Sequence, residues 1–373
     1  MTPLLSTPLT LRQRLWAATQ LDGWLVLGIV LLLSICLITL YSASHQNVVV
    51  LERQLLRIGS GFAVMMVLAA LPARFYLNLA PLLYAGGIFL LLAIFVMGSI
   101  SKGAQRWLEL GFLKFQPSEM MKIAVPLMLA YLLQMESLPL RFKTVAISLL
   151  CMLVPVLFIA KQPDLGTALS VLASGLFVLF FAGLPWRWIG YTVVSSILAA
   201  PVFWMLLHDY QKQRIWTLLD PERDPLGTGY HSLQSKIAIG SGGLWGKGWL
   251  QGTQSQLDFL PEHTTDFIFA VFCEDFGFIG VVCLLTIYFA VILRMLQLTL
   301  SLKRNFHRLF ASSVLFTFCF YLFVNMGMVA GILPIVGIPM PLLSYGGTAL
   351  VTILSSFGIL MSMHATCKRQ MHG

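Results

Sequence analysis

The chain has 373 residues, of which 58% are hydrophobic and 10% are charged. Because soluble domains carry about 25% charged residues, this composition excludes an ordinary soluble enzyme. The net charge of +9 does not indicate nucleic-acid binding, since the sequence has neither a soluble basic domain nor a basic stripe interleaved with aromatic residues.

Apolar runs of about 20 residues recur along the whole sequence, and each is long enough to cross a bilayer as one helix. The first follows Arg12 and Arg14 and is longer than the core of a signal peptide, so we interpret it as a retained helix. The sequence therefore predicts an all-α polytopic membrane protein, with one integral-membrane domain over residues 1–373 built as a bundle of ten transmembrane helices. The predicted spans are residues 23–43, 55–71, 77–98, 117–134, 144–160, 165–183, 187–207, 266–296, 310–332 and 342–363.

The distribution of Lys and Arg predicts the orientation of this bundle. An even number of helices puts both termini on one side, and half of the 24 basic residues fall in the short segments of that side, together with only two acids, Asp22 and Glu136. Short cytoplasmic segments are enriched in Lys and Arg. We therefore expect both termini in the cytoplasm and one large extracytoplasmic loop at about residues 208–265. The inner basic residues are Arg12, Arg14, Arg74, Arg141, Lys143, Arg187, Arg294, Lys303, Arg304, Arg308, Lys368 and Arg369.

Four basic residues gather around one short outer loop, where the charge rule disfavours them: Lys102, Arg106, Lys114 and Lys122. One interpretation is structural, with Glu119 in the first turn of a helix and Lys122 paired with it three residues later. The other is functional, with Lys102, Arg106 and Lys122 clamping a phosphate, since Arg and Lys are its usual partners. The residues alone leave both interpretations open.

The helix predicted from residue 165 starts with a polar motif, Lys161-Gln162-Pro163-Asp164. A proline followed by an acid in the first turn is ordinary helix initiation. On these residues alone we interpret Asp164 as a helix-starting residue rather than a ligand.

A glycine-rich stretch from Ser235 to Gly248 lies inside the predicted large loop and contains Lys247. It looks superficially like a phosphate loop, but it fails the pattern G-x-x-x-x-G-K-S/T, because Ser241 replaces the first glycine and Gly248 the final hydroxyl. Its glycines instead predict tight backbone turns or re-entry at the membrane surface.

The most informative stretch is the acidic segment from Phe259 to Phe267, which closes that loop and runs into a hydrophobic helix. An ionisable residue at the mouth of a membrane helix is costly unless it is used or satisfied. Asp266 could cap a helix starting at Phe267, or Glu262 and Asp266 could act as a base and its partner or as metal ligands. His263 is either a proton carrier or a solvated loop residue.

A connection rich in Pro and Gly joins the last two predicted spans at residues 331–347. Prolines and glycines at this density predict a rigid turn. Its small residues also permit close packing of the neighbouring helices.

Six motifs follow one another along nearly the whole chain: GAQRW, FQPSE, QPDLGT, IGSGGLWGKG, FLPE followed by TDF, and PLLSYGG. In this order they resemble the SEDS family of bacterial membrane proteins (RodA, FtsW and SpoVE), and LGFLKFQPSE, GIPMPLLSYGG and the short termini look most like its RodA, or elongation, branch. The resemblance implies a peptidoglycan glycosyltransferase that polymerises lipid II at the outer face of the cytoplasmic (inner) membrane during cell elongation. It also implies ten helices and partners: a class B penicillin-binding protein, which is a transpeptidase, and other membrane proteins of the elongation complex.

The resemblance also assigns residues. The catalytic aspartate of the family falls on Asp266. The family usually reads His-Thr-Asp, whereas here Thr264-Thr265-Asp266 stands and the histidine is His263, which puts a role for that histidine in doubt. The other motif positions that we expect to bind substrate are Lys102, Arg106, Glu119, Lys122, Asp164, Lys247 and Glu262.

The chemistry of glycan extension suits these residues. A base must take the proton of a sugar 4-hydroxyl, which then attacks the anomeric carbon of a lipid-linked sugar, and Asp266 would be that base. The leaving polyprenyl pyrophosphate must be neutralised by Lys or Arg, by a divalent cation such as Mg²⁺ or Mn²⁺, or by both, and we expect no organic cofactor. Apolar walls between helices would hold the polyprenyl tails of lipid II and of the polyprenyl-pyrophosphate-linked glycan.

The main alternative is a lipid II flippase, which is a transporter rather than an enzyme. Transporters often show inverted repeats and paired broken helices at mid-membrane. Here the polar motifs lie at the outer edge and the sequence shows no repeat, which favours chemistry at the membrane surface. A structural scaffold is a weaker third alternative, because it would not need the outer acids and bases.

Overall fold

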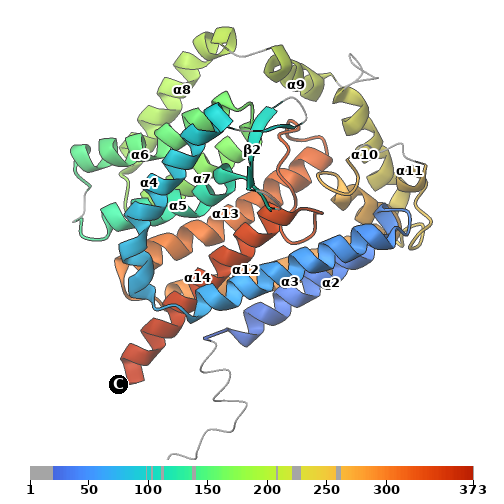
Figure 1. The fold of residues 1–373 in the computed structure, drawn as a ribbon. Helices are drawn as coiled ribbons and strands as arrows, with labels where there is room; N and C mark the ends of the chain where they lie inside the picture. Colours follow the sequence, from blue (N-terminus) through green and yellow to red (C-terminus); the bar gives the residue numbers. More distant parts are fainter. Residues whose placement is uncertain are drawn as a thin grey trace, which may run out of the picture.

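Figure 1 shows the computed structural model, which describes residues 20–372 except 98, 102–103, 111–112, 137–139, 207–208, 221–227 and 258–261. Most described residues are helical. In chain order the elements are α2 (Gly23–Ala43), α3 (Val48–Ala70), α4 (Ala73–Met97), β1 (Ser99–Ser101), β2 (Ala104–Leu110), β3 (Leu113–Phe115), α5 (Pro117–Leu133), α6 (Phe142–Lys161), α7 (Leu165–Phe181), α8 (Trp186–Leu206), α9 (Asp209–Leu219), α10 (Thr228–Gly242), α11 (Thr253–Gln256), α12 (Ile268–Leu300), α13 (Asn305–Val329) and α14 (Gly347–His372).

Each predicted span coincides with one of these helices. Seven described helices are long and apolar enough to cross a membrane, namely α2, α3, α4, α6, α12, α13 and α14. Helix α7 is apolar but shorter, at 17 residues. The chain is therefore a polytopic membrane protein, and the count of ten crossings stays a prediction.

Helix boundaries differ from the predicted spans where local backbone chemistry overrides hydropathy. Helix α3 begins at Val48 rather than at residue 55, because the side chain of Asn47 caps it by accepting hydrogen bonds from amides of the first turn. Helix α14 begins at Gly347 rather than at residue 342, because Leu342 has a φ of 62° and residues 341–344 form turns.

Two predicted loops contain regular structure. The short loop between α4 and α5 folds as an antiparallel sheet with the strand order β1-β2-β3, in which Trp107 lies opposite Ser99 and Leu108 opposite Phe115. The loop predicted at about residues 208–265 holds α9, α10 and α11. The sequence patterns predicted neither the strands nor these helices, because such short segments are not periodic over a membrane-spanning length.

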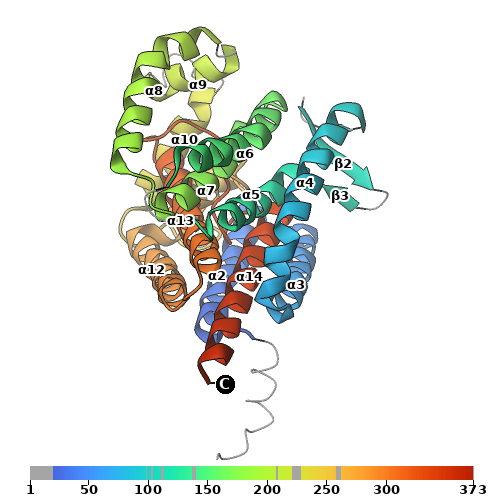
Figure 2. The same cartoon turned by 90° about the vertical axis from the view of Figure 1, so that its left-hand side faces the viewer.

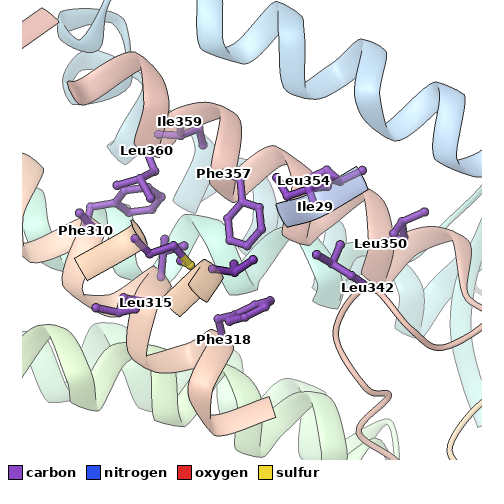
Figure 3. Packing of buried hydrophobic residues seen from close by; sticks show 14 of the residues in the cluster. Ile29, Phe310, Leu315, Phe318, Leu342, Leu350, Leu354, Phe357, Ile359 and Leu360 are labelled. Carbon is purple, nitrogen blue, oxygen red and sulfur yellow. The ribbon is translucent and has the colours of Figure 1, made fainter. Parts of the chain in front are cut away.

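Helix α13 forms the centre of the bundle and packs against α5, α7, α12 and α14. Figure 3 shows Phe318 of α13 close to Phe357 of α14. The rings of Phe318 and Phe357 have centroids 5.4 Å apart, and both side chains are buried. Because lipid tails are as apolar as these residues, such contacts stabilise the bundle through close packing rather than through removal from water.

The N-terminal helices pack beside the C-terminal ones, with α2 along α12 and α3 along α14. At the start of α2, Asp22 pairs with Arg294 of α12 at 2.6 Å, and its amide lies 3.3 Å from Met361 Sδ of α14. The start of α2 and the end of α14 therefore lie on the same side of the bundle. Figures 1 and 2 show the C-terminal end of α14 at the bottom, with α9 and β2 towards the top.

Helix α12 is broken at Gly277, whose φ of 63° and ψ of −164° are not helical. In an unbroken helix the amide of Phe278 would bond to the carbonyl of Glu274, and the amide of Ile279 to that of Asp275. The break frees these two amides and two carbonyls, and such groups are costly in an apolar environment unless another segment pairs with them.

A glycine-rich loop, residues 243–248, supplies those partners. The amides of Lys247 and Gly248 donate to the two freed carbonyls, at 2.9 and 3.1 Å, and the carbonyls of Gly243 and Leu244 accept from the two freed amides, at 2.9 and 3.1 Å. The glycines therefore serve tight backbone pairing, as the sequence predicted.

Candidate active site

Asp266 lies in a turn that runs from residue 262 to residue 267 and leads into α12. The helix begins at Ile268, with Phe267 in the N-cap position. Asp266 therefore precedes the cap, and the alternative in which it caps a helix starting at Phe267 is wrong. Its side chain is partly exposed, as contact with a substrate requires.

The backbone of Asp266 is fixed by a buried side chain of α13. Asn325 Nδ2 donates a hydrogen bond of 2.9 Å to the carbonyl of Asp266 and a second of 2.9 Å to that of Ile338. The amide of Tyr345 also donates to the carbonyl of Thr264 at 3.0 Å. These bonds tie the acidic turn to the connection between α13 and α14, residues 331–346.

Gly337 marks the place where this connection meets both Asp266 and α7. Gly337 has a φ of 78°, which favours glycine, and a Cβ there would lie 3.5 Å from Asp266 Oδ2. On the other side of the connection, a Cβ on Gly166 of α7 would lie 2.8 Å from the carbonyl oxygen of Val336. The connection therefore lies against the start of α7 at Val336 and against the carboxylate of Asp266 at Gly337.

A buried polar network lies on the α7 side of the connection. Gln116 Nε2 donates to Asp164 Oδ2 at 3.1 Å, and Asp164 Oδ1 accepts from the amide of Thr167 at 3.2 Å. Lys122 and Glu119 form an ion pair of 2.6 Å, with side chains 8% and 9% exposed. The helix-starting role of Asp164 and the local pairing of Glu119 with Lys122 are both confirmed, and the structure brings three of the predicted substrate-binding residues together.

Of the three residues of the predicted phosphate clamp, the structure describes the side chain of Lys122. Lys102 lies outside the described residues, and Arg106 is described only through the backbone of β2. Lys122 lies 5.5 Å from the ring centroid of Tyr321 and lines a cavity of about 30 Å³ between α5, α13 and α14. That volume holds little more than water, so the clamp stays a prediction.

Lys247 pairs with a buried carboxylate that sequence reasoning missed. Its Nζ lies 2.8 Å from Glu274 Oε1, and the same carboxylate accepts hydrogen bonds from the amides of Gln254 and Ser255, at 3.0 and 3.3 Å. Glu274 therefore holds α11 against α12. A carboxylate inside an apolar run is itself a signal, and it was available from the sequence.

Glu262 and His263 lie on the exposed edge of the acidic turn. Glu262 has a φ of 52°, and its carboxylate accepts a hydrogen bond of 2.8 Å from Thr265 Oγ1. The ring of His263 meets that of His45 edge-on, with centroids 5.8 Å apart. His231 stacks on Phe267, and burial lowers its pKa although the charge of Glu262 opposes that shift.

An apolar groove of about 560 Å³ runs between α10, α12 and α13. Its wall begins at Phe269, about one helical turn after Asp266, and continues past Cys273 to Gly277. Phe323 and Ile332 at the groove are 69% and 71% exposed. The structure thus provides an apolar wall of the kind expected for a lipid tail, and this wall begins three residues after the candidate base.

The described residues do not offer a ready-made metal cage, since no three of their His, Cys, Asp or Glu side chains cluster in space. Mg²⁺ does not need such a cage, because it is commonly held by one or two carboxylates together with substrate phosphates. The partly exposed carboxylate of Asp266 fits that mode of binding.

The sequence matches the FtsW, RodA and SpoVE family model, described as "Cell cycle protein", over residues 14–369. The chain belongs to this family. Among its family relatives, the peptidoglycan glycosyltransferase MrdB of Escherichia coli K12 is 50% identical over 354 residues, which cover 95% of this chain and 96% of the relative. MrdB of Helicobacter pylori J99 is 38% identical and aligns over 82% of this chain and 80% of the relative.

Solved structures of the family share the fold. A chain from a study of how a peptidoglycan synthase complex coordinates polymerization and crosslinking is 33% identical, with a TM-score of 0.81 over 92% of this chain and 97% of that chain. The rod shape determining protein RodA of Thermus thermophilus is 31% identical, with a TM-score of 0.70 over 92% and 96%. The resemblance drawn from six motifs and the polytopic helical fold are both confirmed.

Proposed function

We propose that this chain is a peptidoglycan glycosyltransferase that polymerises lipid II into glycan strands, with Asp266 as the general base. The observation that carries the proposal is the placement of this carboxylate. It is partly exposed, its backbone is fixed by Asn325, and it lies about one helical turn from the apolar groove that begins at Phe269. A lipid-linked sugar needs both a base for its hydroxyl and an apolar surface for its tail. The 50% identity to a relative named as a peptidoglycan glycosyltransferase supports the same activity.

The proposed reaction balances in atoms and in charge. Asp266 accepts the proton of the sugar 4-hydroxyl as that oxygen attacks the anomeric carbon of the second lipid-linked sugar. A new glycosidic C–O bond forms, and the C–O bond to the pyrophosphate breaks, so that polyprenyl pyrophosphate leaves with the bonding electron pair. The groove between α10, α12 and α13 holds a polyprenyl tail during this exchange.

The leaving pyrophosphate needs positive charge. Lys102 and Arg106 are the first candidates. Lys122 already pairs with Glu119, and Lys247 with Glu274. Either lysine would have to neutralise the pyrophosphate while it also pairs with its carboxylate. A divalent cation held by Asp266 and the pyrophosphate would supply the remaining charge when bound.

The proposed orientation places both termini in the cytoplasm and the chemistry at the outer face of the membrane. The charge asymmetry of the sequence supports it. We further propose that the product passes to a class B penicillin-binding protein for cross-linking during cell elongation. The likeness to a chain of a peptidoglycan synthase complex supports such a partnership.

A lipid II flippase remains the second candidate, and one observation favours it: α12 is broken at Gly277, as helices of transporters often are. Among the described helices, however, only α12 contains non-helical backbone, whereas transporters pair such breaks in two related repeats. The break is also closed by hydrogen bonds from the 243–248 loop. Surface chemistry at Asp266 is therefore the better supported function.

The deciding experiment supplies labelled lipid II to the purified chain, with and without its transpeptidase partner, and separates the products on a gel. We expect a ladder of glycan strands from the parent and none from Asp266→Asn. A flippase would instead move lipid II across the bilayer of a reconstituted vesicle without lengthening it. Transbilayer movement without a ladder, in the presence of the partner, would overturn the proposal.

A further inference from the structure

A basic cavity lies at the opposite end of α13 from Asp266. It has a volume of about 300 Å³ and is enclosed by the start of α4, the residues that follow α5 and the start of α13. Three exposed cations line it, Arg74, Lys303 and Arg304, and none of its described lining residues is acidic. Glycosyl transfer as proposed above makes no use of this cavity.

The distance between the two sites follows from helix geometry. Asn325 contacts Asp266 near the end of α13, whereas Asn305 lines the basic cavity at its beginning. A helix rises about 1.5 Å per residue, so these two positions lie roughly 30 Å apart, which is about the thickness of the hydrocarbon core. The cavity therefore opens at the other membrane face, whichever orientation the chain adopts.

The wall of the cavity contains backbone donors suited to an anion and a buried imidazole. Helix α13 begins there with Arg304 as N-cap and no side-chain cap, so amides of its first turn remain available and its positive dipole end points into this region. His307 in the wall is 4% exposed, and its Nδ1 has no hydrogen-bond partner among the described residues. Among the described residues, Arg74, Lys303 and Arg304 form no ion pair.

Apolar side chains identify the class of anion. Leu77 and Met135 line the same cavity, and Met135 is 91% exposed. A site that combines cations, helix amides and exposed apolar side chains at a membrane face fits a ligand with a phosphate group and an attached acyl chain. Juxtamembrane Lys and Arg are attracted to anionic lipid in this way.

We propose that this cavity binds the head group of an anionic phospholipid, in the leaflet opposite the glycosyl-transfer site. The phosphate lies among Arg74, Lys303 and Arg304 at the start of α13, and the acyl chains leave over Met135. In the proposed orientation this leaflet is the cytoplasmic one.

Native mass spectrometry of the purified full chain, titrated with phosphatidylglycerol or phosphatidylcholine, tests this. We expect one phosphatidylglycerol to bind on the order of 100-fold more tightly than phosphatidylcholine, since each of the three cations contributes about a factor of five. The variant Arg74→Gln/Lys303→Gln/Arg304→Gln should lose that preference. The control Lys143→Gln/Arg308→Gln/Lys368→Gln removes the same charge from exposed positions outside the cavity and should keep it.

Two results would overturn the proposal. An equal loss in both triple variants would mean that lipid is attracted by the general charge of this face and not by the cavity. Displacement of phosphatidylglycerol by an equal concentration of glycerol 3-phosphate would mean that the ligand is a soluble phosphate ester. All substituted positions are exposed, so the variants should fold, which their thermal unfolding would verify.

Discussion

Asn325 donates from one amide nitrogen to the backbone carbonyls of Asp266 and Ile338, at 2.9 Å each. The candidate base is thus positioned through its main chain, by a side chain from another helix. A substitution of its carboxylate leaves these two hydrogen bonds in place.

The first prediction concerns Asp266→Asn. The change keeps the size of the side chain and the backbone bond from Asn325, so the unfolding temperature should stay close to that of the parent. The amide cannot accept the hydroxyl proton, and loss of a general base costs about 10²–10⁴-fold in rate. Glycan ladder formation from lipid II measures the rate. A variant that polymerises near the parent rate would mean that another group is the base.

The second prediction concerns Asn325→Ala, which leaves one buried and one partly buried carbonyl without their donor. A buried group without its partner costs about 1–3 kcal/mol, so the protein should melt at a lower temperature. Polymerisation should fall further than stability alone explains, because Asp266 loses its support. Asn78→Ala, at an exposed position of α4, is the matched control. Equal losses of polymerisation in the two variants would show that Asn325 does not position Asp266.

The third prediction separates stability from charge neutralisation at Lys122. Lys122→Ala leaves the carboxylate of Glu119 buried and unpaired, which typically costs about 3–5 kcal/mol. The double variant Glu119→Gln/Lys122→Met should recover most of that stability in a thermal unfolding assay. If Lys122 neutralises the leaving pyrophosphate, the stable double variant should still fail to build glycan. Normal glycan ladders from the double variant would show that Lys122 does not neutralise the leaving pyrophosphate.

The fourth prediction concerns the break in α12. A Cβ on Gly277 would lie 2.2 Å from the amide nitrogen of Gly246, and the φ of 63° disfavours any side chain. Gly277→Ala should therefore destabilise the protein by more than about 1 kcal/mol. Gly190→Ala provides the contrast, because nothing lies within 4 Å of its Cβ position in α8, and helical Ala is favoured over Gly by about 0.5–1 kcal/mol. Thermal unfolding of both variants checks the difference in sign.

The fifth prediction is topological. A single cysteine placed at Arg304, in a chain whose six native cysteines have been replaced, should resist an impermeant thiol reagent in cells with a permeabilised outer membrane. It should react once the inner membrane is opened. A cysteine at Gln251, in the predicted outer loop, should react before the inner membrane is opened. Labelling of residue 304 in cells with an intact inner membrane would reverse the proposed orientation.

The sequence predicted those features that depend on local spacing. The helical spans follow from apolar run length, and the pair of Glu119 with Lys122 follows from a separation of three residues on a helix. The helix-starting role of Asp164 has the same local origin. The order of the motifs also placed the chain in its family and identified Asp266 as the candidate base.

Features that depend on distant contacts were not predictable in this way. Asn325 reaches Asp266 from another helix, and Lys247 reaches Glu274 across 27 positions of sequence. Neither partner is marked by periodicity, because tertiary packing alone brings them together. The break at Gly277 was hidden inside an apolar run, since hydropathy carries no information about backbone angles.

The paired backbone of the 243–248 loop and the broken α12 also determines how this region opens. Four hydrogen bonds join two segments of the chain that would otherwise unfold separately, so the loop and the first turns of α12 should exchange their amide hydrogens together, as one cooperative unit. An insertion in this loop would shift its register and release the helix end that follows Asp266. A surface loop that looks tolerant of tags or fusion partners is in this protein a structural component of a membrane helix.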